Sequence, residues 1–205
     1  MSFENPLEKY VSDKRVVEYI TSFVNSLKNL SLIIRNPRNS FFGNMIYSKK
    51  CNTYKIYINK NLSPSFFLYV FLHEYAHTLT HLRYTDKVKP HGKEWQYNFL
   101  NLLQDASNKG LFEENIKNEI QKQLLHAHIY SNTRDRYIKS MMDKIDLGKK
   151  ESFLSDIPLQ STVLLSNNMT VKIEKKIRTR YLCSDVNSDN KYLVSGVMTV
   201  KEVIR

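Results

Sequence analysis

The feature that most constrains this chain is an uninterrupted stretch from Ser65 to Leu82, which contains neither glycine nor proline. Ser63-Pro64 precedes it, and this pair is a typical helix start in which the serine hydroxyl caps free amides. The stretch therefore predicts one helix that begins at Ser63 and runs through Leu82. Its apolar residues cover most directions around the axis, which predicts a helix buried on most of its sides.

Within this helix, two histidines and a glutamate have the spacing of a metal site. His73 and His77 are four residues apart, so they lie one above the other on the same helix face. Glu74 lies about 60° round the axis from His77 and can hold a water molecule beside a bound ion. Catalytic zinc takes three protein ligands, and His91, followed by the conformationally free Gly92, is the expected third. We therefore predict Zn2+ bound by the three histidines, with Glu74 as the catalytic general base.

These histidines also have other interpretations. His81 continues the stripe, but a third imidazole on one straight helix lies too far along to complete a tetrahedron, so His81 is expected beside the site or exposed. A core helix whose imidazoles bond to backbone is the plainer alternative. A metal satisfies the buried imidazoles and the carboxylate together, which favours the metal site. His126 and His128 point apart on an expected helix and are interpreted as ordinary histidines.

The motifs His73-Glu74-Tyr75-Ala76-His77 and His91-Gly92-Lys93-Glu94-Trp95 resemble, in order and in gap, those of the SprT-like zinc metallopeptidases, the Spartan-related family. The likeness extends more loosely to the expected strands before the motif helix and to residues 176–181, and it is greatest to bacterial SprT-like domain proteins. It implies a zinc-dependent endopeptidase whose substrates are proteins bound or crosslinked to DNA. Many members end in a zinc ribbon, which two separated cysteines, Cys51 and Cys183, cannot form.

The remaining pattern predicts an α+β fold with a zincin-like catalytic domain over residues 1–148. It consists of an N-terminal helix, a small antiparallel sheet, the motif helix and further helices. The first helix is expected from a Ser12 cap to Leu27. Expected strands are 31–35, 44–48 and 54–59, and expected later helices are 93–103, 113–129 and 134–145. The strand 54–59 alternates well, and we interpret its edge as a weak candidate for binding substrate backbone.

A small β-rich module without a zinc ribbon is expected over residues 149–205, after a linker at 147–152. Its expected strands are 161–165, 169–173, 177–183, 191–194 and 198–203, separated by turn-forming residues. Basic side chains gather here near Tyr181 and Tyr192, and they are candidate nucleic-acid contacts, with a solvated sheet face as the alternative. These basic residues are Lys172, Lys175, Lys176, Arg178 and Arg180.

The net charge of +11 bears on the partners of the chain. Such an excess favours polyanions, which makes DNA a candidate partner beside the protein substrate. Residues 151–205 carry only 8 basic and 6 acidic residues, so most of the excess lies in the catalytic half. The start lacks a signal-peptide pattern, and the longest apolar stretch, Phe66–Leu72, is too short to span a bilayer. We therefore expect a cytoplasmic location and no membrane partner.

Three functional hypotheses follow from the sequence. The leading one is a zinc endopeptidase acting on DNA-associated proteins. The second is a regulatory peptidase that cleaves one specific repressor, and the third is a DNA-binding module with a vestigial metal site. Stimulation of cleavage by single-stranded DNA favours the first, whereas cleavage of a repressor without DNA favours the second. Zinc binding without proteolysis, together with salt-sensitive DNA binding, favours the third.

Overall fold

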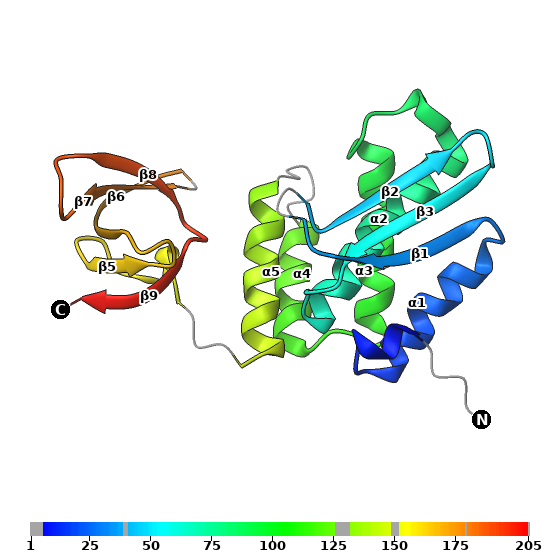
Figure 1. The fold of residues 1–205 in the computed structure, drawn as a ribbon, viewed down its shortest axis with the longest axis horizontal. Coiled ribbons are helices and arrows are strands. Elements are labelled where there is room, and N and C mark those ends of the chain that lie inside the picture. Colours follow the sequence, from blue (N-terminus) through cyan, green and yellow to red (C-terminus); the bar gives the residue numbers. More distant parts are fainter. Residues whose placement is uncertain (1–5, 39–40, 126–131, 149–151, 179, 205) are drawn as a thin grey trace. The chain divides into compact units, whose positions relative to one another are not determined.

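A computed structural model describes residues 6–38, 41–125, 132–148, 152–178 and 180–204 (Figure 1). It has a mixed α+β fold with two sheets and a β-rich C-terminal region, which confirms the α+β class and the β-rich C-terminal region of the prediction. The chain divides into two compact units, residues 1–131 with 141–147 and residues 132–140 with 148–205. Helix α5 (Asn132–Asp146) contributes residues to both units.

The elements before α5 are η1 (Pro6–Lys9), α1 (Lys14–Ser26), β1 (Leu30–Arg35), β2 (Gly43–Ser48), β3 (Thr53–Asn59), α2 (Pro64–Tyr84), η2 (Thr85–Lys87), α3 (Lys93–Asn108) and α4 (Glu114–Leu125). Those after it are β4 (Ser152–Phe153), η3 (Leu154–Asp156), β5 (Thr162–Leu165), β6 (Thr170–Ile177), β7 (Arg180–Asp185), β8 (Lys191–Ser195) and β9 (Thr199–Ile204). Every predicted helix and strand has a counterpart among them. Helix α3 extends five residues beyond its predicted end, and the end predicted for α4 lies outside the described residues.

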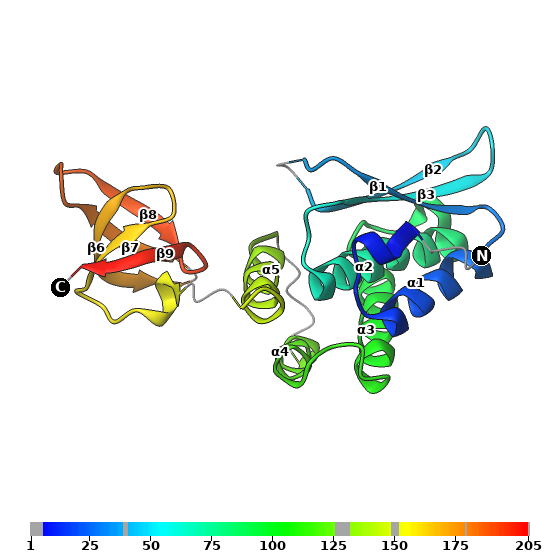
Figure 2. The same cartoon turned by 60° about the horizontal axis from the view of Figure 1, so that its bottom comes forward.

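The sheet of the first unit is mixed, not antiparallel as predicted. Its order is β1-β3-β2, with β1 parallel to β3 and β2 antiparallel to it. Arg35 at the end of β1 and Gly43 at the start of β2 lie beside Asn59 and Ile58, which are neighbouring residues of β3. The helices of this unit lie on one face of the sheet (Figure 2).

The motif helix α2 is the core of the first unit. It packs on β2 and β3 on one side and on α3 on another, and thirteen of its residues are buried. This confirms the prediction of a helix that is buried on most sides.

The predicted caps of two helices were wrong. Helix α1 is capped by Asp13 and not by Ser12, because the Asp13 carboxylate accepts from the Arg15 amide at 2.9 Å. At the start of α2, Ser63 occupies the cap position, but its hydroxyl makes no capping bond. Instead, the carboxylate of Asp146 in α5 accepts from the amide and the hydroxyl of Ser65, both at 2.7 Å. A carboxylate offers two acceptors and a negative charge, both of which suit a helix N-terminus.

The β-rich region is one antiparallel sheet in the order β4-β9-β5-β6-β7-β8. Buried residues that include Val163, Ile173 and Cys183 form its core. Several strand boundaries differ from the prediction. Ile177 ends β6 and does not begin the next strand, because the chain turns at Arg178 with a φ of 55°. Ser152, predicted as the end of the linker, forms β4 with Phe153 and pairs with β9.

Among the described residues, no helix combines the length and apolar character that crossing a bilayer requires.

Candidate metal centre

Three imidazoles from two segments of the first unit meet at one place. His73 and His77 come from α2, and His91 comes from the loop that leads into α3. The Nε2 atom of His91 lies 3.1 Å from Nε2 of His77 and 3.1 Å from Nε2 of His73. The three residues form a group whose ligand atoms all lie within 4.8 Å of one another, so they could hold a metal ion.

The spacing of these nitrogens fits a tetrahedral ion. Two nitrogens bound to one Zn2+ at about 2.0–2.1 Å in a tetrahedron lie about 3.3 Å apart. The observed separations of 3.1 Å are close to this value before any adjustment of the side chains. An all-nitrogen donor set is also one that zinc accepts readily, along with copper, iron and nickel. The residues therefore fit a transition metal, and zinc is one member of that class.

Burial keeps all three imidazoles neutral. It lowers the pKa of His73 well below 6.5, with additional lowering from the charges of His77 and His91. Burial, followed by the charge of His91, lowers the pKa of His77 to about 3. Burial alone lowers the pKa of His91. Because only the neutral imidazole offers a lone pair to a metal, the site is in its ligand form at neutral pH.

Gly92 was expected to supply the unusual backbone conformation before α3, but His91 adopts it. The left-handed conformation belongs to His91, with a φ of 58°, whereas Gly92 has an ordinary φ of −68°. Glycine is needed at 92 for space, because a Cβ there would lie 2.9 Å from the carbonyl oxygen of Lys89. Gln96 donates from Nε2 to the carbonyl of His91 at 3.0 Å, which ties the loop to α3. The turn and this hydrogen bond together aim His91 back at α2.

Trp95 forms the wall behind the three imidazoles. Its ring centroid lies 4.7 Å from that of His73, 5.2 Å from His77 and 4.5 Å from His91. The indole Nε1 donates to the carbonyl of His73 at 3.3 Å, and Trp95 is 1% exposed. The sequence indicated Trp95 only as part of an apolar stripe, since helical periodicity does not reveal that one ring contacts three ligands. Trp95 fixes the imidazole planes by packing.

Glu74 is buried where α2 meets β2. Its side chain is 6% exposed, and its Cγ and Oε1 lie 2.9 Å from the position that a Cβ on Gly43 would occupy. The charge of Glu74 interacts with Arg35 at the end of β1. Burial and the charge of Arg38 lower the pKa of Arg35, and the charge of Glu74 opposes this by raising it. Neither Gly43 nor Arg35 was predicted to be near the site, because only tertiary folding brings these strand ends to the helix.

His81, the other histidine among the described residues, does not join the group. His81 points to the sheet, with Nδ1 2.9 Å from the hydroxyl of Tyr54 and its ring packed at a tilt against Tyr47, the ring centroids 4.3 Å apart. It is therefore a link between α2 and the strands. His126 and His128 lie outside the described residues.

The prediction that the edge of strand 54–59 binds substrate was wrong. Residues 54–59 belong to β3, which is paired on both sides and has no free edge. Strand β2 is an edge of this sheet, and it begins at Gly43 beside Glu74. The Asn59 amide donates to the Phe42 carbonyl, so the alternating antiparallel pattern turns the amide and carbonyl of Gly43 and Met45 to the open side.

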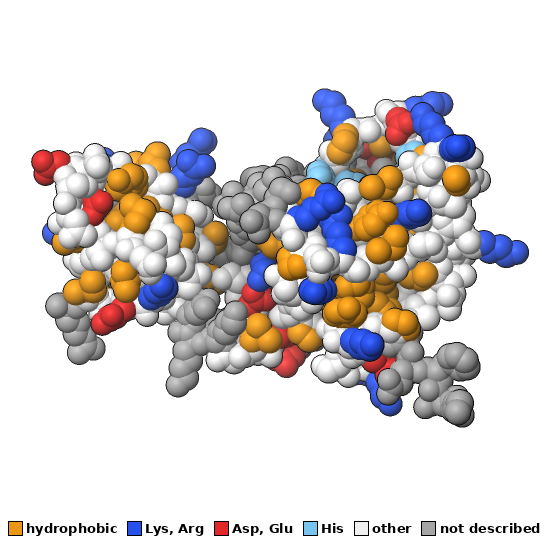
Figure 3. Space-filling view, viewed as in Figure 1, with side chains coloured by type: hydrophobic (Ala, Val, Ile, Leu, Met, Phe, Trp, Pro, Cys, Tyr) orange, Lys and Arg blue, Asp and Glu red, His pale blue; other side chains and the backbone are white. Residues whose placement is uncertain are grey.

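All five basic residues predicted as nucleic-acid contacts are exposed on β6, β7 or the turn between them. Lys172, Lys175 and Arg180 share the sheet face that points away from the core, because they pair with Ser184, Leu182 and Ile177. Lys176 lies in the row of Tyr181, and Arg178 is in the turn. Tyr181 is 5% exposed and cannot stack on a base, whereas Tyr192 is 38% exposed. On the visible face of both units, lysine and arginine side chains stand apart with other residues between them (Figure 3).

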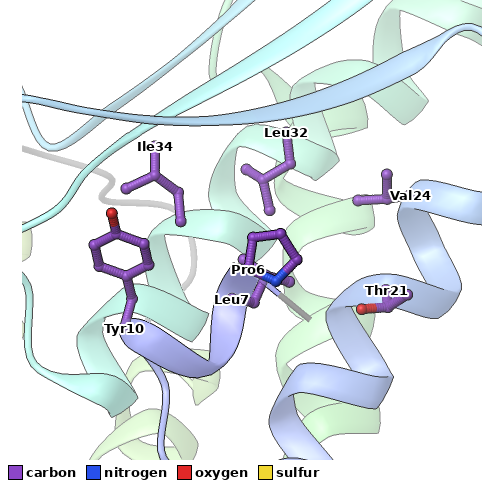
Figure 4. Close-up of a pocket in the computed structure, with 7 residues that line it drawn as sticks. All are labelled: Pro6, Leu7, Tyr10, Thr21, Val24, Leu32 and Ile34. Carbon is purple, nitrogen blue, oxygen red and sulfur yellow. The ribbon is translucent and has the colours of Figure 1, made fainter. Parts of the chain in front are cut away.

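An apolar pocket of about 340 Å³ lies between η1, α1 and β1 (Figure 4). Leu7, Val24, Leu32 and Ile34 form much of its wall, and none of the three histidines or Glu74 lines it. It offers no metal ligand, so the imidazole cluster remains the candidate for chemistry.

Comparison with known proteins agrees with this site. Residues 13–108 match the model of the SprT-like family. This part of the chain is therefore similar to the SprT-like family, which agrees with the resemblance predicted from the two histidine motifs. The matched range runs from the cap of α1 to the end of α3 and contains His73, Glu74, His77 and His91. No curated protein and no solved structure was found to match the chain.

Proposed function

We propose that this protein is a zinc-dependent endopeptidase in which His73, His77 and His91 hold Zn2+ and Glu74 is the general base. The observation that carries the proposal is the convergence of three neutral imidazoles, two of them on the helix that also carries the buried Glu74. The family match supports a metallopeptidase-type function. The Nε2 atom of His91 lies 3.1 Å from the Nε2 atoms of both His73 and His77, a spacing that suits one shared ion.

Each protein group has a defined task in this mechanism. When bound, zinc supplies a positive charge that polarises the scissile carbonyl and makes water more acidic. Glu74 accepts a proton from the attacking water and passes it to the leaving amine. Trp95 keeps the imidazole planes in place and excludes water from one side of the site. Tyr75, the residue after Glu74, packs against Phe23 of α1 and against Phe71 and has no part in this scheme.

We expect the main chain of the substrate to extend along β2. Its open edge offers the amide and carbonyl groups of Gly43 and Met45, and Gly43 lies against Glu74. Edge addition binds extended backbone with little regard for side chains. The preferred substrates are therefore unfolded or extended protein segments.

We further propose that these substrates are associated with DNA. The support is the net charge of +11 and the exposure of the basic residues on β6 and β7. Such charges bind phosphates without regard to base sequence, so they would bring the enzyme to DNA without selecting a site.

The test compares the wild type with Glu74→Gln and His91→Ala. Each protein is analysed for zinc by mass spectrometry and incubated with an unfolded casein substrate, with and without single-stranded DNA. We expect the wild type to hold one zinc and to cleave casein. Glu74→Gln should keep zinc and lose about 100-fold or more in rate, and His91→Ala should lose zinc.

Other results would support the rival functions. Equal cleavage by wild type and Glu74→Gln contradicts the proposed mechanism. Cleavage of one repressor without any effect of DNA identifies a regulatory peptidase. Bound zinc without cleavage of any unfolded substrate, together with salt-sensitive DNA binding, identifies a DNA-binding module.

A further inference from the structure

Gly43, the first residue of β2, leaves no room for a side chain. A Cβ atom at this position would lie 2.6 Å from Cγ1 of Val70 and 2.9 Å from both Cγ and Oε1 of Glu74. Real Cβ atoms essentially never show contacts shorter than 3.0 Å, so any other residue forces a movement. The space that glycine leaves is filled by the proposed general base and its neighbour one helical turn earlier.

The backbone conformation does not explain the glycine. Gly43 is absent from the described residues with a positive φ, which include Gly110 and Gly148. It lies in a regular strand, where any residue can adopt the backbone angles and glycine weakens the strand. Close approach of α2 is therefore the physical reason for glycine at this position.

The strand cannot easily retreat from the helix. Gly43 is paired in register with Ile58 of β3, which is 0% exposed and packed in the core. Strand β3 is held in turn by β1 on its other side. A side chain at position 43 would therefore displace the side chains of Val70 and Glu74 before it displaced the backbone of the strand.

We propose that Gly43 is a positioning residue for Glu74. By presenting bare backbone to the helix, it lets the Glu74 carboxylate stand against the start of the edge strand. The inference rests on the proposed function for its catalytic meaning, but the contact itself does not depend on it. A substitution that adds one methyl group should move the carboxylate without touching the three imidazoles.

The experiment compares five variants with the wild type: Gly43→Ala, Val70→Ala, Gly43→Ala/Val70→Ala, Glu74→Gln and Gly110→Ala. Val70→Ala removes the 2.6 Å contact and leaves those with Glu74. Gly110→Ala is the matched control, because its backbone has a φ of 66° but a Cβ there meets nothing within 4 Å. Thermal unfolding and zinc content are measured for every protein.

We expect Gly43→Ala to keep its zinc and lose at least about tenfold in kcat, part of what a general base contributes, with KM changed less than about twofold. The double variant Gly43→Ala/Val70→Ala should keep the low kcat of Gly43→Ala. Gly110→Ala should lower thermal stability without lowering kcat. If the double variant is as active as Val70→Ala, the contact concerns packing alone and the proposal is wrong. Wild-type kcat in Gly43→Ala overturns it too.

The visible absorption spectrum of the protein loaded with Co2+ in place of zinc supplies a second measurement, because it reports the geometry around the ion. If the wild type cleaves no more than Glu74→Gln, the proposed function fails, and this spectrum then decides the question of Gly43. A spectrum of Gly43→Ala displaced from the wild type in the direction of Glu74→Gln supports the positioning role. A spectrum that coincides with the wild type overturns it.

Discussion

The two units of this chain bury different kinds of side chain. The described core of the β-rich region is built from residues such as Val163, Val171 and Ile173. The first unit buries an imidazole and a carboxylate, His73 at 9% exposure and Glu74 at 6%, in the middle of its longest helix. Buried polar groups of this kind lower stability unless a partner satisfies them. The difference favours the first unit, which contains the matched SprT-like segment, as the place of the proposed chemistry.

The strongest test of this comparison removes one ligand. His77→Ala should reduce bound zinc from one per chain to a trace, since two imidazoles alone hold zinc weakly. The matched control is His81→Ala on the same helix, which should keep its zinc because His81 points to Tyr54. Metal analysis after dialysis against a mild chelator measures both. Zinc retained by His77→Ala, or lost equally from both variants, would contradict the assigned ligand set.

The wall behind the ligands should matter almost as much. Trp95→Ala removes a ring packed on all three imidazoles and should lower the free energy of unfolding by about 3–5 kcal/mol. Trp95→Phe, which retains an aromatic ring without the indole N–H, should lose less. Chemical denaturation of the zinc-free proteins gives both values. A loss below that of Val163→Ala in the β-rich region would mean that the wall is not an important part of the core.

The helix and its ligand spacing were predictable from sequence, because the i,i+4 relation of His73 and His77 is a local property of helices. His91 follows the helix after a short loop, and both the need of catalytic zinc for a third ligand and the resemblance to the family motif indicated its role. What sequence could not indicate depends on distant segments. Gly43 and Arg35 approach Glu74 only in the folded sheet, where β3 lies between β1 and β2 and pairs in parallel with β1. Asp146 reaches Ser65 across eighty-one residues, which no local pattern encodes.

Acid should destabilise the first unit in the absence of metal. The pKa of His77 is lowered to about 3 in the folded protein, whereas an unfolded histidine titrates near 6.5. Below pH 6.5 the unfolded chain therefore binds more protons than the folded one. The free energy of unfolding then falls as the pH falls towards 3, at up to about 1.4 kcal/mol per pH unit for each such histidine.

Denaturation of the zinc-free protein between pH 7 and pH 4 measures this slope. His77→Gln removes one of the titrating groups, so its slope should be shallower than that of the wild type. A wild-type stability that is constant over this range would show that the imidazoles are not held neutral by burial.

The smallest effect is expected from the β-rich region. Lys172→Gln/Lys175→Gln/Arg180→Gln neutralises the exposed sheet face and should change the free energy of unfolding by less than about 0.5 kcal/mol. Cleavage of casein without DNA should change by less than about twofold, since surface substitutions away from a site have little effect. If this face binds DNA, the slope of log affinity against log salt concentration should become shallower, by an amount that corresponds to the loss of up to about three phosphate contacts.

The matched control for that variant is Lys176→Gln/Arg178→Gln, which removes neighbouring charges that lie off this face. Fluorescence anisotropy with labelled single-stranded DNA at several salt concentrations compares the two. A larger change in the salt dependence for the triple variant, after allowing for its extra charge, assigns DNA binding to the face shared by Lys172, Lys175 and Arg180. Equal changes per charge would mean that the sheet geometry is irrelevant and that only the net charge of the chain attracts DNA. A large loss of casein cleavage in either variant would break the division of labour between the two units, because it would give the β-rich region a part in the chemistry.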